Sequence, residues 1–363
     1  MSNLDLANSA RKTLERFVHE INPKIEELFD DEIAKVEISN PKEMKLVKQM
    51  LEHSREYLLR PQKRLRPSLV YYGFKFGEGK VDERIWKVAM AVEIVHAAIL
   101  MHDDFEDSDS VRRGGPTTHK YFQSQGKAGE HYGEAMAVNL GDALWNLGYR
   151  ILVGSGFESE RLIPALEHLF DTIVTTAYGQ AFDISLGLMG KFTEKDILEV
   201  HRTKTAVYTY ENPLMIGALL SGAKEECFAG IREYSMNAGL AFQLQDDILG
   251  VFGDSLKTGK SADSDLLQGK CTLLVLKALE KGNDLAVSSL DKVWGRGHAT
   301  EGDVTAARKA IVESGAYDYS RKLAIGYAKK AADAAAGLRE LKLNREAVDY
   351  LQGIAEYMVI REV

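Results

Sequence analysis

Apolar residues recur three or four positions apart along most of this chain of 363 residues. In the first such stretch, Leu14, Phe17, Val18 and Ile21 fall on one face of a helix. Only seven prolines interrupt the pattern, and alternating runs typical of strands are scarce. The same spacing predicts helices over residues 4–36, 43–59, 63–76, 82–104, 131–154, 160–188, 194–210, 213–222, 225–250, 271–281, 303–313, 317–340 and 344–359. We therefore expect an all-α fold, a large helical bundle formed by one domain over residues 1–363.

The charge and cysteine content exclude several classes of protein. The formal net charge is −8, whereas sequence-independent nucleic-acid binding needs a basic face. Two cysteines, Cys227 and Cys271, imply no disulfide framework and indicate a reducing compartment. The most apolar window, residues 89–101, contains Glu93 and His96 and is too short and polar for a membrane span. We expect a cytoplasmic protein with neither nucleic acid nor membrane as a partner.

The first acidic cluster is Asp103-Asp104-Phe105-Glu106-Asp107. On a helix, Asp103 and Asp107 share a face, with Asp104 beside them. The preceding residues 93–102 are apolar almost all round, which predicts a buried helix. Such a helix aims its carboxylates into a cleft, where divalent metals offset their repulsion. The alternative is a solvated helix end with a chance acidic run.

Two arginines follow this cluster, in Arg112-Arg113-Gly114. Guanidinium forks suit phosphate oxygens because they can bind two of them at once. The alternative is a surface loop paired with Glu106 or Asp109. Acid, metal and base together indicate a bound diphosphate.

The second acidic cluster, Asp246-Asp247, lies near the end of a predicted helix. Gln243 precedes it by one turn, and its fifth position is Gly250, which is not an acid. Lys260 and Lys270 follow, with Asp263 and Asp265 between them. Mg²⁺ favours a few carboxylates plus substrate phosphates, so we expect the two acidic clusters to face each other across the metals.

A purely basic run, Lys63-Arg64-Leu65-Arg66-Pro67, begins another apolar helix. A second anion could bind there, helped by the positive partial charge of a helix N-terminus. His96 lies on the buried helix, two turns before Asp103. Taken alone, such a basic run is more often a solvated face, and such a histidine is more often part of the core.

These motifs, in this order, resemble the trans-isoprenyl diphosphate synthases, an all-α family that makes geranyl, farnesyl, geranylgeranyl and longer prenyl diphosphates. The resemblance covers about residues 63–274. It rests on Lys63-Arg64-Leu65-Arg66-Pro67, His96, Asp103 to Gly114, Gly179-Gln180 with Asp183, Lys204-Thr205, Phe242-Gln243-Leu244-Gln245-Asp246-Asp247, and Gly253-Asp254 through Lys260 to Lys270.

The resemblance implies a bundle around a central cavity, a homodimer, and a role for each matched residue. The expected ligands of three Mg²⁺ ions, which Mn²⁺ can replace, are Asp103, Asp104, Asp107, Asp246 and Asp247. The allylic diphosphate is expected on Arg112, Lys204, Lys260 and Lys270. Isopentenyl diphosphate is expected on Lys63, Arg66, His96 and Arg113. Thr205 and Gln243 are expected between the substrates, and Gln180 near the developing cation.

Two positions depart from the family pattern. Relatives commonly have Gly-Gly where this chain has Pro61-Gln62. Many have Asp where this chain has Gly250, and there we expect water in place of the third carboxylate. The reaction implied is ionisation of the allylic substrate, condensation and proton loss, with water excluded.

Product length is expected to depend on the helix that ends in the first cluster. In this family the residue five before the first Asp often closes the tunnel, and here it is Ala98, followed by Ile99. A small side chain leaves the tunnel open toward Val95, one turn deeper. We therefore expect a product longer than C15, with C20 favoured; the alternatives are a longer polyprenyl chain or a C15 product.

Two other functions remain open. A class I terpene cyclase uses a similar acidic cluster but one substrate, and it does not need Lys63, Arg66, His96 and Arg113. A non-catalytic partner subunit would lack metal ligands, and only Gly250 hints at such a loss. A helical scaffold with surface charges is disfavoured because both clusters adjoin buried helices.

Overall fold

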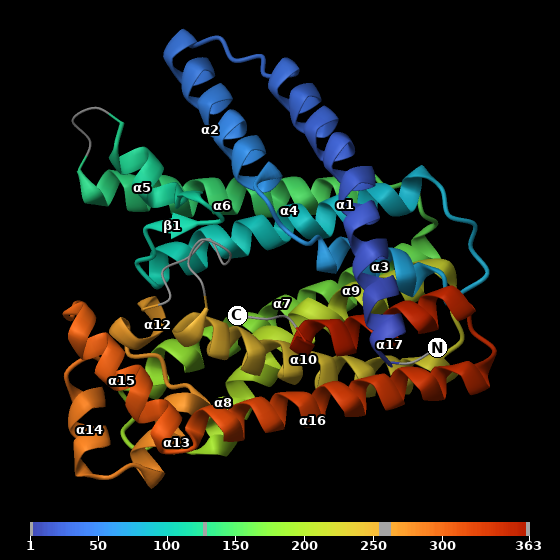
Figure 1. Cartoon of the computed structure of the whole chain (residues 1–363). Coiled ribbons are helices and arrows are strands. Elements are labelled where there is room, and N and C mark those ends of the chain that lie inside the picture. The colour runs from blue at the N-terminus through green and yellow to red at the C-terminus, as the bar shows by residue number, and fades with distance from the viewer. Residues whose placement is uncertain (1–2, 126–128, 254–262, 361–363) are drawn as a thin grey trace. The chain divides into compact units, whose positions relative to one another are not determined.

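The structure is a computed structural model that describes residues 3–125, 129–253 and 263–360. Its elements are almost all helices, which confirms the predicted all-α fold (Figure 1). The first half contains α1 (Asn3–Ala34), α2 (Pro41–Leu59), α3 (Leu65–Phe74), α4 (Glu83–Glu106), β1 (Val111–Arg112), β2 (Gly115–Pro116), α5 (Thr118–Gln123), α6 (Glu130–Val153) and α7 (Ser159–Leu186). The second half contains α8 (Glu194–Val200), η1 (His201–Glu211), α9 (Asn212–Ser221), α10 (Glu226–Phe252), α12 (Ser264–Leu267), α13 (Leu273–Lys281), α14 (Asp284–Asp291), α15 (Glu301–Glu313), α16 (Ala316–Gly337), η2 (Leu338–Leu341) and α17 (Arg345–Ile360).

Contacts within the chain group it into two compact units. One consists of residues 12–71 and 81–157 and contains α2, α4, the β1–β2 hairpin, α5 and α6. The other consists of residues 1–11, 72–80 and 158–363 and contains α7 and all later helices. Helices α1 and α3 have residues in both units, and the single domain over 1–363 stays a prediction.

In the unit of residues 12–71 and 81–157, α4 packs closely along α6 (Figure 1). Two glycines of α6 make the approach possible. A Cβ on Gly148 would lie 2.6 Å from Cγ2 of Val95, and one on Gly141 would lie 2.2 Å from Nε2 of His102. The predicted burial of α4 is confirmed, since most of its residues between Ile85 and Ala98 are buried. Among the helices of the described ranges, α4 alone is long and apolar enough to cross a membrane. However, 78% of its most apolar 18-residue stretch is buried inside the structure.

In the unit that begins at Glu158, α10 is the central helix, packed against α16 and η1. Glycine again allows the closest approach, because a Cβ on Gly239 would lie 2.3 Å from Cα of Ala206 on η1. Gly179 of α7 contacts η1 from another side, with its Cβ position 2.7 Å from the backbone nitrogen of Lys204. Helix η1 is therefore fixed between α7 and α10.

The predicted helix over 194–210 is found as two different kinds of helix. The chain forms α8 and then continues as η1, an 11-residue π-helix. π-helical segments are rare and occur frequently at functional sites. Three short helices, α5, α12 and α14, and the β1–β2 hairpin were not predicted.

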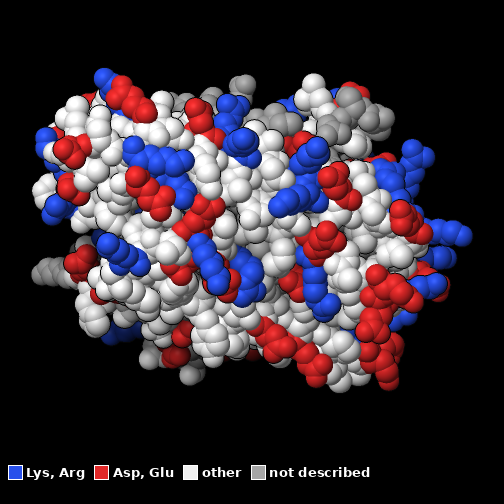
Figure 2. Space-filling view, turned by 90° about the horizontal axis from the view of Figure 1, so that it is seen from below, with Lys and Arg blue, Asp and Glu red and all other residues white. Residues whose placement is uncertain are grey.

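Charged side chains of both signs are interspersed on the face of the molecule shown in Figure 2. Exposed ion pairs such as Arg202–Glu199 and Arg16–Glu20 occur within single helical segments. Pairs of this kind contribute about 0–1 kcal/mol each, so the buried pairs below matter more.

Candidate active site

The C-terminal end of α4 carries the first acidic cluster. Asp104 is completely buried, and its two oxygens accept hydrogen bonds from Tyr57 at 2.8 Å and from Nε of Arg112 at 2.5 Å. Nη2 of Arg112 also lies 3.3 Å from Asp103. Asp107 caps the helix with its backbone N–H on the carbonyl of Asp103. The carboxylates thus gather where the helix dipole is negative, which calls for cations.

Burial and neighbouring charges shift the pKa values of these groups. Burial raises the pKa of Tyr57, and the Asp104 carboxylate raises it further, so the phenol remains a hydrogen-bond donor. Burial opposes the charge of Arg112, yet Asp104 and its neighbours outweigh that effect and raise the pKa of the guanidinium. Burial raises the pKa of the Asp104 carboxyl, and the charge of Arg112 and the hydrogen bonds from Arg112 and Tyr57 act against that rise.

A tight hairpin presents the two arginines. Val111–Arg112 pairs antiparallel with Gly115–Pro116, and the turn residues Arg113 and Gly114 have φ of 53° and 79°. Two positive φ values at the centre of a two-residue turn are typical of type I′. Arg60 holds the hairpin by donating to the carbonyls of Arg112 and Pro116, both at 3.0 Å. Burial lowers the pKa of Arg113 to about 10.

The basic run contains Arg64, which forms a buried ion pair, and Arg66, which lies beside His96. Arg64 is 2% exposed and forms a buried ion pair of 2.9 Å with Glu93. Arg66 lies 2.8 Å from Nε2 of His96. Burial and the charge of Arg66 hold the pKa of His96 well below its ordinary value, so the ring is neutral and Nε2 accepts a hydrogen bond from Arg66. Lys63 is exposed.

Lys204 and Thr205 come from the π-helix η1. Nζ of Lys204 donates to Asp183 of α7 at 2.8 Å. Gln180 lies on the same helix as Asp183, directly after Gly179, whose contact with η1 brings the two segments together. The structure therefore places Lys204 and Gln180 on adjoining segments, as a shared site requires.

A chain of four polar side chains links η1 to α10. Thr205 donates to Oε1 of Gln243 at 2.7 Å, and Nε2 of Gln243 donates to Oδ1 of Asp247 at 2.9 Å. The other oxygen of Asp247 lies 3.1 Å from Nε2 of His201 but is buried and receives no hydrogen bond from the described part of the chain. Three of the four residues were predicted; His201 was not.

The remaining predicted residues are distributed as follows. Asp246 is partly exposed on α10, and Lys270 lies 3.7 Å from Asp265. Lys260 lies outside the described residues. On α4, Ala98 is completely buried, Val95 is 1% exposed and packs on Gly148, and Ile99 is partly exposed.

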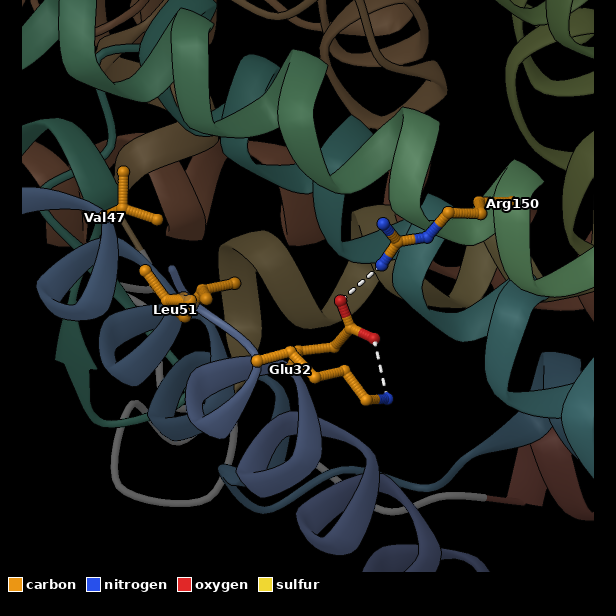
Figure 3. A pocket seen from close by; sticks show the side chains of 6 residues that line it. Glu32, Val47, Leu51 and Arg150 are labelled. Atoms are coloured by element: carbon orange, nitrogen blue, oxygen red, sulfur yellow. Dashed lines mark hydrogen bonds and ion pairs between the residues drawn. The ribbon is translucent and has the colours of Figure 1, made fainter. Parts of the chain in front are cut away.

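A pocket of about 510 Å³ lies in the unit of residues 12–71 and 81–157 (Figure 3). It is lined by Glu32, Lys35, Val36, Val47, Leu51 and Arg150. Glu32 bridges Arg150 and Lys35 across it. None of its lining residues belongs to the predicted site.

Each unit by itself carries acids of the kind that bind Mg²⁺ together with a phosphate ligand. Asp103 and Asp107 offer carboxylate oxygens in one unit, and Asp246 and Asp247 do so in the other. One buried oxygen of Asp247 receives no hydrogen bond from the described residues. Within residues 3–125, 129–253 and 263–360, no group of three His, Cys, Asp or Glu side chains can hold a metal by itself. Mg²⁺ is usually held by one or two carboxylates, waters and substrate phosphates, so such a cage is not needed.

Sequence reasoning missed Tyr57, which donates a hydrogen bond to Asp104, and His201, whose ring lies beside Asp247. Tyr57 stands in an apolar helical pattern, where a tyrosine is indistinguishable from core. His201 begins the π-helix one turn before Thr205, and its spacing to that residue is the one available signal.

Comparisons with known proteins agree with this geometry. The family model for polyprenyl synthetase matches residues 48–311. The chain is 34% identical over 302 residues to a geranylgeranyl diphosphate synthase of Methanosarcina mazei, covering 83% of this chain and 86% of that protein. It is 34% identical to a geranylfarnesyl diphosphate synthase of Aeropyrum pernix, covering 82% and 90%.

Solved structures show the same fold. Geranylgeranyl pyrophosphate synthase from Corynebacterium glutamicum, complexed with isoprenyl diphosphate and magnesium, superposes with a TM-score of 0.86 at 26% identity, covering 97% of this chain and 99% of that one. The enzyme from Geoglobus acetivorans superposes with a TM-score of 0.77 at 29% identity, covering 96% and 99%. The chain therefore belongs to the polyprenyl synthetase family and is a trans-prenyltransferase.

Proposed function

We propose that this enzyme condenses isopentenyl diphosphate with an allylic diphosphate in a Mg²⁺-dependent reaction and releases geranylgeranyl diphosphate, C20. The observation that carries the proposal is the end of α4, where Arg112 is fixed against Asp104 beside Asp103. Relatives named for C20 and C25 products support it.

The allylic diphosphate is bound by the acidic clusters and their cations. Asp103 and Asp107 share a helix face and serve, with Asp246 and Asp247, as ligands of three Mg²⁺ ions, which Mn²⁺ can replace. Both oxygens of Asp104 are already hydrogen-bonded, which supports a role in orienting Arg112 toward the diphosphate. When bound, Mg²⁺ offsets the negative charge that develops as the allylic C–O bond breaks.

Isopentenyl diphosphate is bound at a second anion site, formed by Lys63, Arg66, His96 and Arg113. His96 is neutral and accepts from Arg66, so it fixes the guanidinium without adding charge. This second anion site supports a two-substrate enzyme over a cyclase, which has one substrate.

Thr205, Gln243 and Gln180 act where positive charge develops in the allylic fragment. Their hydroxyl and amide oxygens can face a cation without forming a covalent bond to it. The hydrogen bonds from Thr205 to Gln243 and from Gln243 to Asp247 keep those dipoles in place before reaction. Preorganised dipoles are the main source of electrostatic stabilisation of a charge that develops in a transition state.

We also propose a homodimer and a cytoplasmic location. Exposed apolar side chains follow one face of α7, with Ile163, Phe170, Val174 and Tyr178 each at least 44% exposed. The family resemblance implies a homodimer, and we propose that a second copy of the chain covers this face. Both cysteines are free and buried, which suits a reducing compartment. Sedimentation of the protein and of Phe170→Glu tests the dimer, and an unchanged dimer in that variant contradicts the assignment of this face.

The proposed activity is tested with purified protein, Mg²⁺, labelled isopentenyl diphosphate and each allylic starter in turn. The dephosphorylated products are separated by chromatography, and a C20 alcohol is expected. Hydrocarbon from an allylic diphosphate alone would indicate a cyclase. Absence of any reaction would contradict the proposal and favour a non-catalytic partner subunit.

A further inference from the structure

Arg60, the residue after α2, connects that helix to the hairpin that carries Arg112 and Arg113. Two nitrogens of its guanidinium donate to the carboxylate of Glu56, Nε at 2.9 Å and Nη2 at 2.7 Å. The third nitrogen, Nη1, donates to the carbonyls of Arg112 and Pro116, both at 3.0 Å. The side chain is only 5% exposed, so little water is present to replace these hydrogen bonds.

The backbone of Arg60 is fixed as well. Pro61 disfavours the helical conformation for the residue before it, and Arg60 has a φ of −56° and a ψ of 154°. Gln62 then donates its side-chain amide to the carbonyl of Leu58, in the last turn of α2. Pro61 and Gln62 are the two residues found where relatives commonly have Gly-Gly, and here they hold the segment that carries Arg60.

The hairpin has little support of its own. Its strands, Val111–Arg112 and Gly115–Pro116, have two residues each, and an isolated two-stranded hairpin is marginally stable at best in water. Arg113 has a φ of 53°, which costs free energy in a residue other than glycine. Because the hydrogen bonds from Arg60 reach one carbonyl in each strand, they fix both strands to the end of α2.

A ring of contacts returns from Arg60 to Arg112 by another route. The guanidinium of Arg60 lies 4.9 Å from the ring centroid of Tyr57, and the hydroxyl of Tyr57 donates to Asp104 at 2.8 Å. The other oxygen of Asp104 accepts from the side chain of Arg112. Arg112 is therefore held at its side chain by Asp104 and at its backbone by Arg60.

We propose that Arg60 is a positioning residue for both diphosphate sites. The proposal rests on the proposed function, in which Arg112 binds the allylic diphosphate and Arg113 binds isopentenyl diphosphate. The carbonyl of Arg112 belongs to the peptide group that joins these two arginines, and Arg60 holds that carbonyl. A shift of this peptide group would move both guanidiniums, so Arg60 acts on the binding of both substrates through the hairpin.

Steady-state kinetics of Arg60→Met test the proposal, because methionine keeps an unbranched apolar stem and removes every donor. The KM values of the allylic diphosphate and of isopentenyl diphosphate are both expected to rise about 10-fold or more, since a misplacement of about 1 Å can cost about 100-fold. The kcat at saturation should change less than either KM, as it does when binding alone is weakened. Arg60→Lys keeps the charge and can still donate to the carbonyls, so it should raise both KM values by a smaller factor. That variant decides the question if Arg60→Met does not fold.

Arg55→Met is the matched control, since Arg55 lies on the same helix and pairs with Asp30 of α1. It should leave both KM values unchanged. A lower melting temperature or kcat in Arg60→Met with both KM values unchanged would show a purely structural role and overturn the proposal. A rise in the KM of one substrate alone would overturn the link between the two sites.

Binding without turnover gives a second readout. In the absence of Mg²⁺, isopentenyl diphosphate should raise the melting temperature of the wild type, and Arg60→Met should need about 10-fold more ligand for the same rise. A wild-type chain that shows neither condensation nor this response contradicts the proposed function, and the role of Arg60 with it. An active wild-type chain whose KM values and ligand response are shared by Arg60→Met contradicts the further inference alone.

Discussion

Thr205 on the π-helix η1 donates its hydroxyl proton to Gln243 on α10 at 2.7 Å. The side-chain amide of Gln243 in turn donates a hydrogen bond to Asp247 at 2.9 Å. One amide thus links a residue expected between the substrates to a carboxylate expected at the metal. The amide can satisfy both neighbours because it has an acceptor at one end and a donor at the other.

Replacement of Gln243 by leucine is predicted to affect both stability and turnover. The change removes the acceptor of Thr205 and the donor to Asp247. Leaving such buried groups unpaired costs about 1–3 kcal/mol of unfolding free energy, and kcat should fall about 10- to 100-fold. Urea unfolding and steady-state kinetics measure the two effects.

The matched control is Asn237→Leu on the same helix. Its amide donates to the carbonyl of Glu233, one turn away, and a change at a partly exposed position of this kind alters stability by about 0.5 kcal/mol or less. Equal losses in the two variants would contradict the role given to Gln243.

Gly239→Ala is predicted to disturb the enzyme through its packing. The new Cβ would lie 2.3 Å from Cα of Ala206, the residue after Thr205. Overpacking of this kind costs about 1–3 kcal/mol, and the displaced η1 carries Lys204 and Thr205 with it. Both the melting temperature and kcat/KM should fall.

Gly326→Ala on α16 is the control for the glycine change itself. No atom lies within 4 Å of a Cβ there, so alanine should stabilise the helix by about 0.5–1 kcal/mol. If both glycine variants are stabilised with unchanged kinetics, the close packing of Gly239 on η1 has no functional consequence.

The helices could be predicted because burial imposes a period of 3.6 residues on the sequence. α4 shows this well, found at Glu83–Glu106 where residues 82–104 were predicted. The π-helix could not be predicted, since one extra residue per turn hardly changes an apolar pattern over 11 residues. The β1–β2 hairpin was missed because its strands have two residues each, too few to show alternation.

The candidate site could be predicted where chemistry depends on residue type, and not where it depends on shape. Charge and spacing along the chain were enough to identify Asp103, Arg112 and Lys204. The hydrogen bond from Tyr57 to Asp104 has no trace in the pattern, because it depends on how two segments pack.

Stability is predicted to fall in mild acid because of His53. Burial and the charge of Arg60 lower the pKa of His53 to about 4. The charge of Glu56 acts in the opposite direction but is the smaller effect. The unfolded chain, with a pKa of about 6.5, binds the proton more readily. The contribution of His53 is therefore complete above pH 6.5 and is lost by about 1.4 kcal/mol per unit as the pH falls toward 4.

Urea midpoints measured from pH 7 to pH 4.5 check this slope. His53→Gln can still bond to Thr118, the partner of His53 at 3.1 Å, but does not titrate, so its stability should fall less steeply. His19→Gln, an exposed control, should follow the wild-type curve. Parallel curves for His53→Gln and the wild type would contradict the prediction.

Product length is predicted to depend on Ala98. Val95 and His102 lie on the same face of α4, three residues before and four after it, and each packs on a glycine of α6. A larger side chain at position 98 would occupy space that we propose the growing prenyl chain uses. Ala98→Phe should shift the product from C20 toward C15, as measured by chromatography of the dephosphorylated alcohols.

The melting temperature separates this effect from damage to the core. Ala98 is completely buried, so phenylalanine in a filled core would cost about 1–3 kcal/mol, whereas phenylalanine in a tunnel costs little. Ala98→Ser, nearly equal in volume, should keep the wild-type product. A destabilised Ala98→Phe variant that still releases C20 would place the tunnel floor elsewhere, because the added ring would then be in the protein core and not in the path of the product.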